Sequence, residues 1–246
     1  MKTQSLLLTF LLLLILPLSV IAQEDMLTVS AENVEISSDG MAYDSYLAFP
    51  DAEGVYPAIV LVHSFNGMEQ GYLDMTEQLA SEGFVVLAVG WQTFERSPAD
   101  AVVEQLLLDS IDYLTARDDV DSEKIGLTGF CAGGRYTMLF MPQIEAFSAG
   151  VAWYGFPNNG NPSPSDFIDE LESPMLIIHG TQDSPSPIAD IYAYATALGE
   201  AGADFELKVY ANEPHGFMLS DGELRTDDIA TDAYNEMVDY FTRMLG

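Results

Sequence analysis

A glycine-rich segment around a cysteine is the feature of the sequence with the clearest chemical meaning. Residues 129–134 read GFCAGG, after an expected strand at 124–128 and before a helical run. This is the pattern of a nucleophile elbow, in which the nucleophile occupies a sharp strand-to-helix turn and flanking glycines leave room for it. At a helix N-terminus, amide N–H groups and the helix dipole stabilise negative charge on sulfur. The pattern predicts that Cys131 is a nucleophile.

An inert thiol packed in a glycine-rich turn is the alternative, because free cysteine is among the most buried residue types. Cys131 is the only cysteine, so it cannot form an intramolecular disulfide. The downstream residues favour catalysis, because the elbow fold requires the order nucleophile, acid, histidine. Asp183 and then His215 follow Cys131, each just beyond an expected strand.

The expected roles follow from the side-chain chemistry. His215 would act as general base or ion-pair partner of the cysteine and would protonate the leaving alkoxide. Asp183 would orient the imidazole, although an aspartate in such a turn can also be a simple cap. Asp190 and Glu213 are the alternative acids.

Backbone amides near the nucleophile are expected to stabilise the developing oxyanion. The amide of Ala132 is one donor, and the amide of Phe65, in the loop after the first core strand, is the other. Ser64 is not interpreted as a nucleophile, because no serine stands in a Gly-x-Ser-x-Gly setting. His63 and His179 end expected strands and are interpreted as structural or pocket-lining.

The elements that must position these residues follow an alternating pattern. An extended lead-in at 27–36 and 41–49 is typical of edge hairpins. Short apolar runs then alternate with amphipathic ones, which predicts an α/β fold, a mostly parallel central sheet flanked by helices on both faces. The expected buried strands are 58–62, 84–89, 125–128, 149–152, 175–178 and 206–210.

Apolar stripes at helical spacing complete the pattern. They comprise Tyr72, Met75 and Leu79; Val103, Leu107, Ile111 and Leu114, in a helix opening near 97–98; and Ala233, Met237, Tyr240 and Met244. Residues 158–165 are typical of a loop. With no repeat and no linker, residues 23–246 are expected to form a single domain.

The N-terminus has the features of a secretory signal peptide. Lys2 precedes an apolar run at 6–20, and residues 20–22 supply a small-x-small cleavage pattern. Residues 1–22 are therefore expected to be removed, which predicts a periplasmic or extracellular protein. The alternative is an uncleaved membrane anchor, but the run is short and no basic cluster follows it.

The composition is strongly acidic, with 39 acidic against 8 basic residues and a net charge of −31. Such a field repels nucleic acid and anionic membranes, so neither is an expected partner, and the acidity is interpreted as a solubilising surface. The scattered histidines and single cysteine provide no metal-ligand spacing. We expect no metal, no cofactor and a monomer.

Taken together, these motifs resemble the dienelactone hydrolase family of α/β-hydrolases. The resemblance rests on the elbow at 129–134, the HGTQD segment at 179–183, the PHGF segment at 214–217 and the WYG segment at 153–155. It covers most of the chain from about residue 38 onward. It implies a hydrolase of carboxylic esters or lactones with Cys131, His215 and Asp183 as its triad.

Two departures from the family pattern bear on the substrate. The best-known members have a glutamate that helps to activate the cysteine where this chain has Ser64, and an arginine for the substrate carboxylate where it has Met218 and Leu219. Arg96 and Arg135 lie outside matching motifs. A neutral ester or lactone is therefore the expected substrate. The residues expected to line its pocket are Ser64, Trp91, Arg96 and Tyr154.

The sequence thus predicts an exported hydrolase that works through an acyl-enzyme. One alternative is a non-catalytic exported binding protein that retains a hydrolase scaffold, with Cys131 inert or redox-sensitive. Another is a peptidase or acyltransferase of the same fold.

Overall fold

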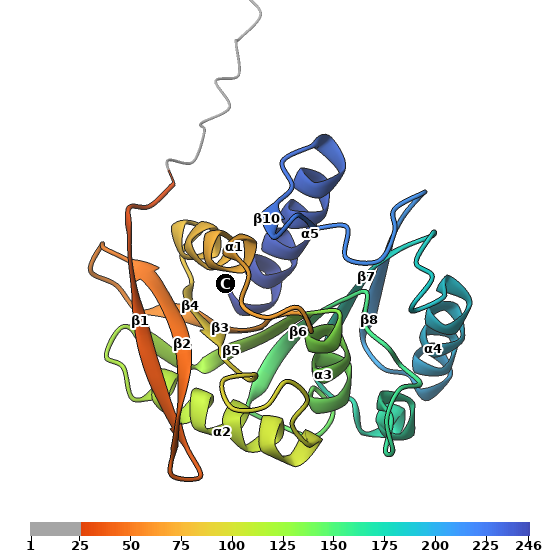
Figure 1. Cartoon of the computed structure of the whole chain (residues 1–246), viewed down its shortest axis with the longest axis horizontal. Helices are drawn as coiled ribbons and strands as arrows, with labels where there is room; N and C mark the ends of the chain where they lie inside the picture. The colour runs from red at the N-terminus through yellow and green to blue at the C-terminus, as the bar shows by residue number, and fades with distance from the viewer. Residues whose placement is uncertain (1–25) are drawn as a thin grey trace, which may run out of the picture.

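The computed structural model describes residues 26–246, which form an eight-stranded sheet with helices on both faces (Figure 1). The strand order is β1-β2-β4-β3-β5-β6-β7-β8. β1 pairs antiparallel with β2 and β2 with β4, whereas all other pairings in this sheet are parallel. The mostly parallel α/β sheet expected from the sequence is confirmed. The expected signal peptide, residues 1–22, lies outside the described residues.

All the expected strands are present in this sheet. Their bounds are β1 (Val29–Ser38), β2 (Met41–Pro50), β3 (Tyr56–Val62), β4 (Val85–Val89), β5 (Val120–Phe130), β6 (Phe147–Trp153), β7 (Met175–Gly180) and β8 (Phe205–Tyr210). β8 is only partly buried, contrary to expectation, because it lies at the edge of the sheet. Its Glu206 and Lys208 instead pair with Arg243 and Glu236 of the last helix.

Helices cover the sheet in two layers. α1 (Gln70–Ser81) and α5 (Asp228–Leu245) pack on one face, while α2 (Asp100–Thr115), α3 (Ala132–Phe140) and α4 (Ile188–Ala201) pack on the other (Figure 1). The expected stripes face the sheet, although Met244 is only partly buried. α2 begins slightly later than expected, because Ala99 is still extended.

Two short elements were not expected from the sequence. A 3₁₀ helix, η1 (Pro164–Glu170), begins inside the expected loop at 158–165. A small hairpin, β9 (Leu219–Ser220) and β10 (Glu223–Leu224), follows the loop that carries His215. Each is too short to produce a recognisable period in the sequence.

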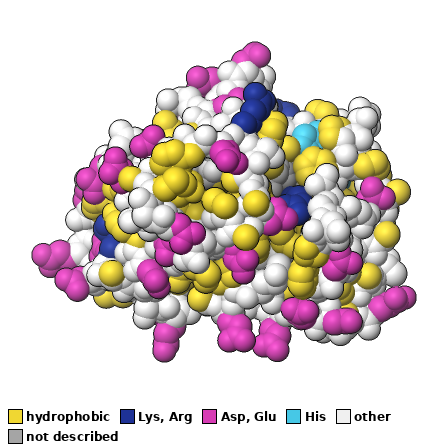
Figure 2. All heavy atoms as spheres, turned by 60° about the horizontal axis from the view of Figure 1, so that its bottom comes forward, with side chains coloured by type: hydrophobic (Ala, Val, Ile, Leu, Met, Phe, Trp, Pro, Cys, Tyr) yellow, Lys and Arg dark blue, Asp and Glu magenta, His cyan; other side chains and the backbone are white. Residues whose placement is uncertain are grey.

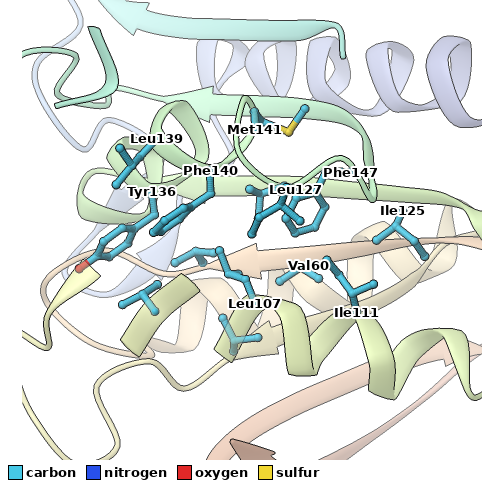
Figure 3. Packing of buried hydrophobic residues seen from close by; sticks show 14 of the residues in the cluster. Val60, Leu107, Ile111, Ile125, Leu127, Tyr136, Leu139, Phe140, Met141 and Phe147 are labelled. Carbon is cyan, nitrogen blue, oxygen red and sulfur yellow. The ribbon is translucent and has the colours of Figure 1, made fainter. Parts of the chain in front are cut away.

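The packing of α2 and α3 against the sheet forms the larger core cluster (Figure 3). Leu107 and Ile111 of α2 belong to the same cluster as Val60 and Leu127, which lie on the central strands β3 and β5. Burying one such side chain contributes about 1.5–3 kcal/mol. This packing fixes the two strands whose ends carry Phe65 and Cys131.

α5 supports β5 from the opposite face through a close approach at Gly126. A Cβ atom added there would lie 2.7 Å from the ring of Phe241, which is fully buried. The glycine therefore allows the aromatic ring to pack directly on the strand that leads to Cys131.

No helix among residues 26–246 has both the length and the apolar content needed to cross a membrane.

Replacing Phe241 should destabilise the domain, because Phe241→Ala leaves a cavity against β5. We expect the free energy of unfolding, measured by urea denaturation, to fall by about 3–5 kcal/mol. Ile229→Ala is the matched control, because this large apolar side chain of the same helix is 37% exposed. The control should change stability by no more than about 0.5 kcal/mol. Equal losses in both variants would contradict the packing role of Phe241.

Candidate active site

Cys131 occupies the sharp turn between β5 and α3. Its backbone has φ 58° and ψ −109°, a strained conformation for a residue with a side chain. The neighbouring glycines permit this turn: a Cβ atom on Gly129 would lie 2.2 Å from the carbonyl oxygen of Gly133, and one on Gly133 would lie 2.0 Å from that of Val62. The elbow expected from the glycine pattern is therefore present in the structure.

His215 and Asp183 meet although 32 residues separate them. Nδ1 of His215 lies 2.7 Å from Oδ2 of Asp183. The other carboxylate oxygen, Oδ1, accepts a hydrogen bond of 2.7 Å from the backbone amide of Ser186. Asp183 is only 5% exposed, so its two hydrogen bonds hold the carboxylate in one orientation.

The electrostatics of His215 favour its protonated form. Burial opposes the positive charge, but the hydrogen bond to Asp183 and the proximity of Cys131 outweigh it and raise the pKa of His215 to about 9. Among residues 26–246, Nε2 of the ring has no oxygen or nitrogen partner. The surroundings of the ring therefore favour its protonated form, and Nε2 is the ring nitrogen that Asp183 does not engage.

Two aromatic rings hold the imidazole in place. The centroids of Tyr154 and Phe156 lie 5.2 and 5.3 Å from that of His215. Tyr154 was expected in the substrate pocket, whereas Phe156 was missed. The available sequence signal for Phe156 was its position just after the WYG segment at 153–155.

Arg225 clamps the loop that carries His215. Its Nη1 donates hydrogen bonds of 2.7 Å to Glu213 and 2.6 Å to the carbonyl oxygen of Phe217, on either side of the histidine. Its Nε also donates to Asp227, which caps α5. Glu213, an alternative acid in the sequence analysis, is thus paired with Arg225 rather than with His215.

The remaining candidates have other environments. Asp190 lies in the first turn of α4 and makes no hydrogen bond to His215. His63 stacks on Trp91, and burial lowers its pKa to about 4. His179 is fully buried and its Nε2 is hydrogen-bonded to the carbonyl oxygen of Ser186 at 2.8 Å. Both histidines are therefore buried and held by neighbouring protein groups.

The amides of Phe65 and Ala132 are the donors expected for an oxyanion. Neither donates a hydrogen bond to the described part of the chain, residues 26–246. Ala132 opens α3, where the first amides of a helix have no intrahelical acceptor. Phe65 follows the end of β3, beside β5 in the sheet. Both amides therefore lack an acceptor among these residues.

A cavity of about 620 Å³ opens beside the cysteine. Besides Cys131 and His215 it is lined by Phe65, Asn66, Trp91, Ser97, Pro98, Asp100, Ala132, Arg135, Tyr136, Phe156, Asn159, Gly160 and Pro185. Its aromatic content suits an uncharged acyl group. Trp91, a predicted pocket residue, lies in this lining, whereas Asp100 was missed because it stands far from the sequence motifs.

A second cavity of about 420 Å³ also contacts Cys131 and His215. It is more polar, and its wall contains the predicted pocket residues Ser64 and Tyr154 together with Glu69 and Asp221. Arg96 lines neither cavity. Its guanidinium lies 4.8 Å from the centroid of Phe65, at the edge of the larger one.

Acidic side chains dominate the charged surface of the protein. On the face shown in Figure 2, acidic side chains are spread widely, basic ones are few, and histidine atoms reach the surface beside hydrophobic side chains. Within residues 26–246, no cluster of three or more His, Cys, Asp or Glu side chains could hold a metal ion.

Known proteins are similar in sequence to most of this chain. A Salmonella typhimurium protein named "Putative carboxymethylenebutenolidase" is 28% identical over 240 residues, which cover 89% of each chain. A Bradyrhizobium protein named "Probable 2-oxo-3-(5-oxofuran-2-ylidene)propanoate lactonase" is 25% identical over 211 residues, covering 77% of this chain and 85% of its own.

Solved structures show the same fold. A Klebsiella pneumoniae protein described as a "Putative Dienelactone Hydrolase" superposes with a TM-score of 0.79 at 26% identity, covering 88% of this chain and 99% of its own. The dienelactone hydrolase-like phosphotriesterase P91 superposes with a TM-score of 0.74 at 18% identity, covering 89% of this chain and 99% of its own. The model of the dienelactone hydrolase family matches residues 43–91 and 89–245. Because these matches span most of the chain, the protein belongs to the dienelactone hydrolase family of α/β-hydrolases.

Proposed function

We propose that this protein hydrolyses carboxylic esters or lactones of small molecules through an acyl-enzyme on Cys131. The observation that carries the proposal is the placement of Cys131 in a strained elbow beside the imidazole of His215, which is itself held by Asp183 at 2.7 Å. The names of the relatives, a butenolidase and a lactonase, support the same class of bond.

The first half of the reaction forms a thioester. The thiolate of Cys131 attacks the carbonyl carbon, and the electron pair of the C=O bond moves to oxygen, where the amides of Phe65 and Ala132 stabilise it. When this electron pair returns and the C=O bond forms again, the C–O bond to the leaving group breaks. The alkoxide takes a proton from Nε2 of His215, whose pKa of about 9 keeps that proton available at neutral pH.

The second half releases the acid. His215, now neutral, takes a proton from a water molecule as the water oxygen attacks the thioester carbon. The attack gives a tetrahedral intermediate, and the collapse of this intermediate breaks the C–S bond and releases the carboxylic acid. Thiolate and imidazolium are then restored, and Asp183 has kept the same ring nitrogen directed at the reaction throughout.

We further propose that the substrate is uncharged and that the protein acts after export. The net charge of −31 repels anionic substrates, and the arginine of the larger cavity is already paired with Asp100. The positive start, apolar run and small-x-small site at residues 1–22 support cleavage of a signal peptide.

Removing the thiol should abolish turnover. With Cys131→Ala, release of p-nitrophenol from p-nitrophenyl butyrate is expected to fall at least about a thousandfold, because no nucleophile remains. The fold should persist, since alanine also has a Cβ atom and fits the same turn.

Iodoacetamide provides an independent check, because Cys131 is the only cysteine of the chain. Alkylation should inactivate the wild type with a stoichiometry of about one label per chain. Turnover that survives both the substitution and the alkylation would refute the role of Cys131.

The pH dependence should report His215. We expect kcat/KM to fall as pH rises through about 9, because the imidazolium that protonates the alkoxide is lost there. Asp183→Asn removes the carboxylate that favours the charged ring, so the alkaline limb should move to lower pH. The same variant should lower kcat/KM by at least about a hundredfold.

Asp190→Asn is the matched control for charge and side-chain shape. This carboxylate makes no hydrogen bond to His215, so the alkaline limb should stay in place. An alkaline limb that does not respond to Asp183→Asn would exclude the Asp183–His215 pair as its origin.

A further inference from the structure

The larger cavity contains one ion pair with a direct bearing on substrate choice. Of its lining residues, Asp100 and Arg135 carry permanent charges. Asp100 is the first residue of α2, and Arg135 lies one turn after Cys131 on α3. Both charges therefore stand in the wall of the cavity that contacts the nucleophile.

The pair is bidentate. Nη1 and Nη2 of Arg135 donate to the two carboxylate oxygens of Asp100 at 2.8 and 2.7 Å, and Nε donates to the carbonyl oxygen of Asn159 at 2.7 Å. The side chain of Arg135 is 9% exposed, against 36% for Asp100. The bidentate geometry and the burial of the guanidinium favour this pairing, although Asp100 itself is partly exposed.

The alternative partner of such a guanidinium would be a substrate carboxylate, which has the same planar geometry. With Asp100 in place, an anionic group that enters the cavity would meet a guanidinium already paired with a carboxylate, and the charge of that carboxylate would repel it. The other nearby arginine, Arg96, lies outside the lining and contacts the ring of Phe65. All three guanidinium nitrogens of Arg135 are thus already engaged by Asp100 and Asn159.

We propose that Asp100 is a specificity-determining residue that masks Arg135 and thereby excludes acyl groups bearing a carboxylate. The proposal rests on the proposed function. It assigns the acyl group to the larger cavity because both oxyanion residues, Phe65 and Ala132, line that cavity and neither lines the smaller one.

The test compares two esters with the same leaving group and acyl groups of four carbons, p-nitrophenyl butyrate and mono-p-nitrophenyl succinate. In Asp100→Asn, the ratio of kcat/KM for the succinate ester to that for the butyrate ester should rise about tenfold or more. Because the ratio is taken within one variant, a loss of folded enzyme cancels out.

Two variants isolate the cause. Glu104→Gln, on the same helix but outside the cavity lining, removes the same charge and should leave the ratio within about twofold of the wild type. Asp100→Asn combined with Arg135→Met should return the ratio to the wild-type value. A ratio that does not rise in Asp100→Asn, or that stays high in the double variant, overturns the proposal.

A readout without turnover separates this proposal from the proposed function. The single cysteine can be alkylated by iodoacetate or iodoacetamide, which differ in charge but little in size. Asp100→Asn should raise the rate ratio of iodoacetate to iodoacetamide several-fold, and Glu104→Gln should not. Butyrate hydrolysis that persists in Cys131→Ala would refute the proposed function alone, whereas an unchanged alkylation ratio would refute the masking by Asp100.

Discussion

The close approach of three backbone segments around Cys131 is the constraint on which the rest of the site depends. A Cβ atom on Gly133 would lie 2.0 Å from the carbonyl oxygen of Val62, and one on Gly134 would lie 2.3 Å from that of Trp153. α3 therefore begins wedged between the ends of β3 and β6. This packing holds the cysteine at φ 58°, a backbone conformation that side chains rarely adopt.

Charge pairing is the second organising principle, and it follows from the composition. In a chain with 39 acidic and 8 basic residues, most arginines find carboxylates close by. The ion pairs are Arg117–Asp119, Arg135–Asp100, Arg225–Glu213, Arg225–Asp227 and Arg243–Glu206. The positive charge that remains next to the thiol is the imidazolium of His215, which Asp183 and Cys131 stabilise against burial. This imidazolium is the group that the proposed mechanism uses to protonate the leaving group.

Much of this architecture could be predicted from the sequence, because local patterns encode it. Alternating apolar runs specified the parallel strands, and stripes at helical spacing specified α1, α2 and α5. The glycines around Cys131 specified the elbow, because only glycine fits where backbones nearly touch. The chain order nucleophile, acid, histidine indicated Cys131 and His215 but left Asp183, Asp190 and Glu213 as possible acids, and the fold places Asp183 against His215.

Tertiary structure decided what depends on residues distant in sequence. The pairing of Asp100 with Arg135, the clamp of Arg225 on both sides of His215 and the partial exposure of β8 have no local signature. Each results from segments that meet only after the sheet and helices have packed. The sequence by itself therefore determined which residues could do chemistry. Only the folded chain decided which charges remain free to meet a substrate, because an ion pair depends on distances in space rather than along the chain.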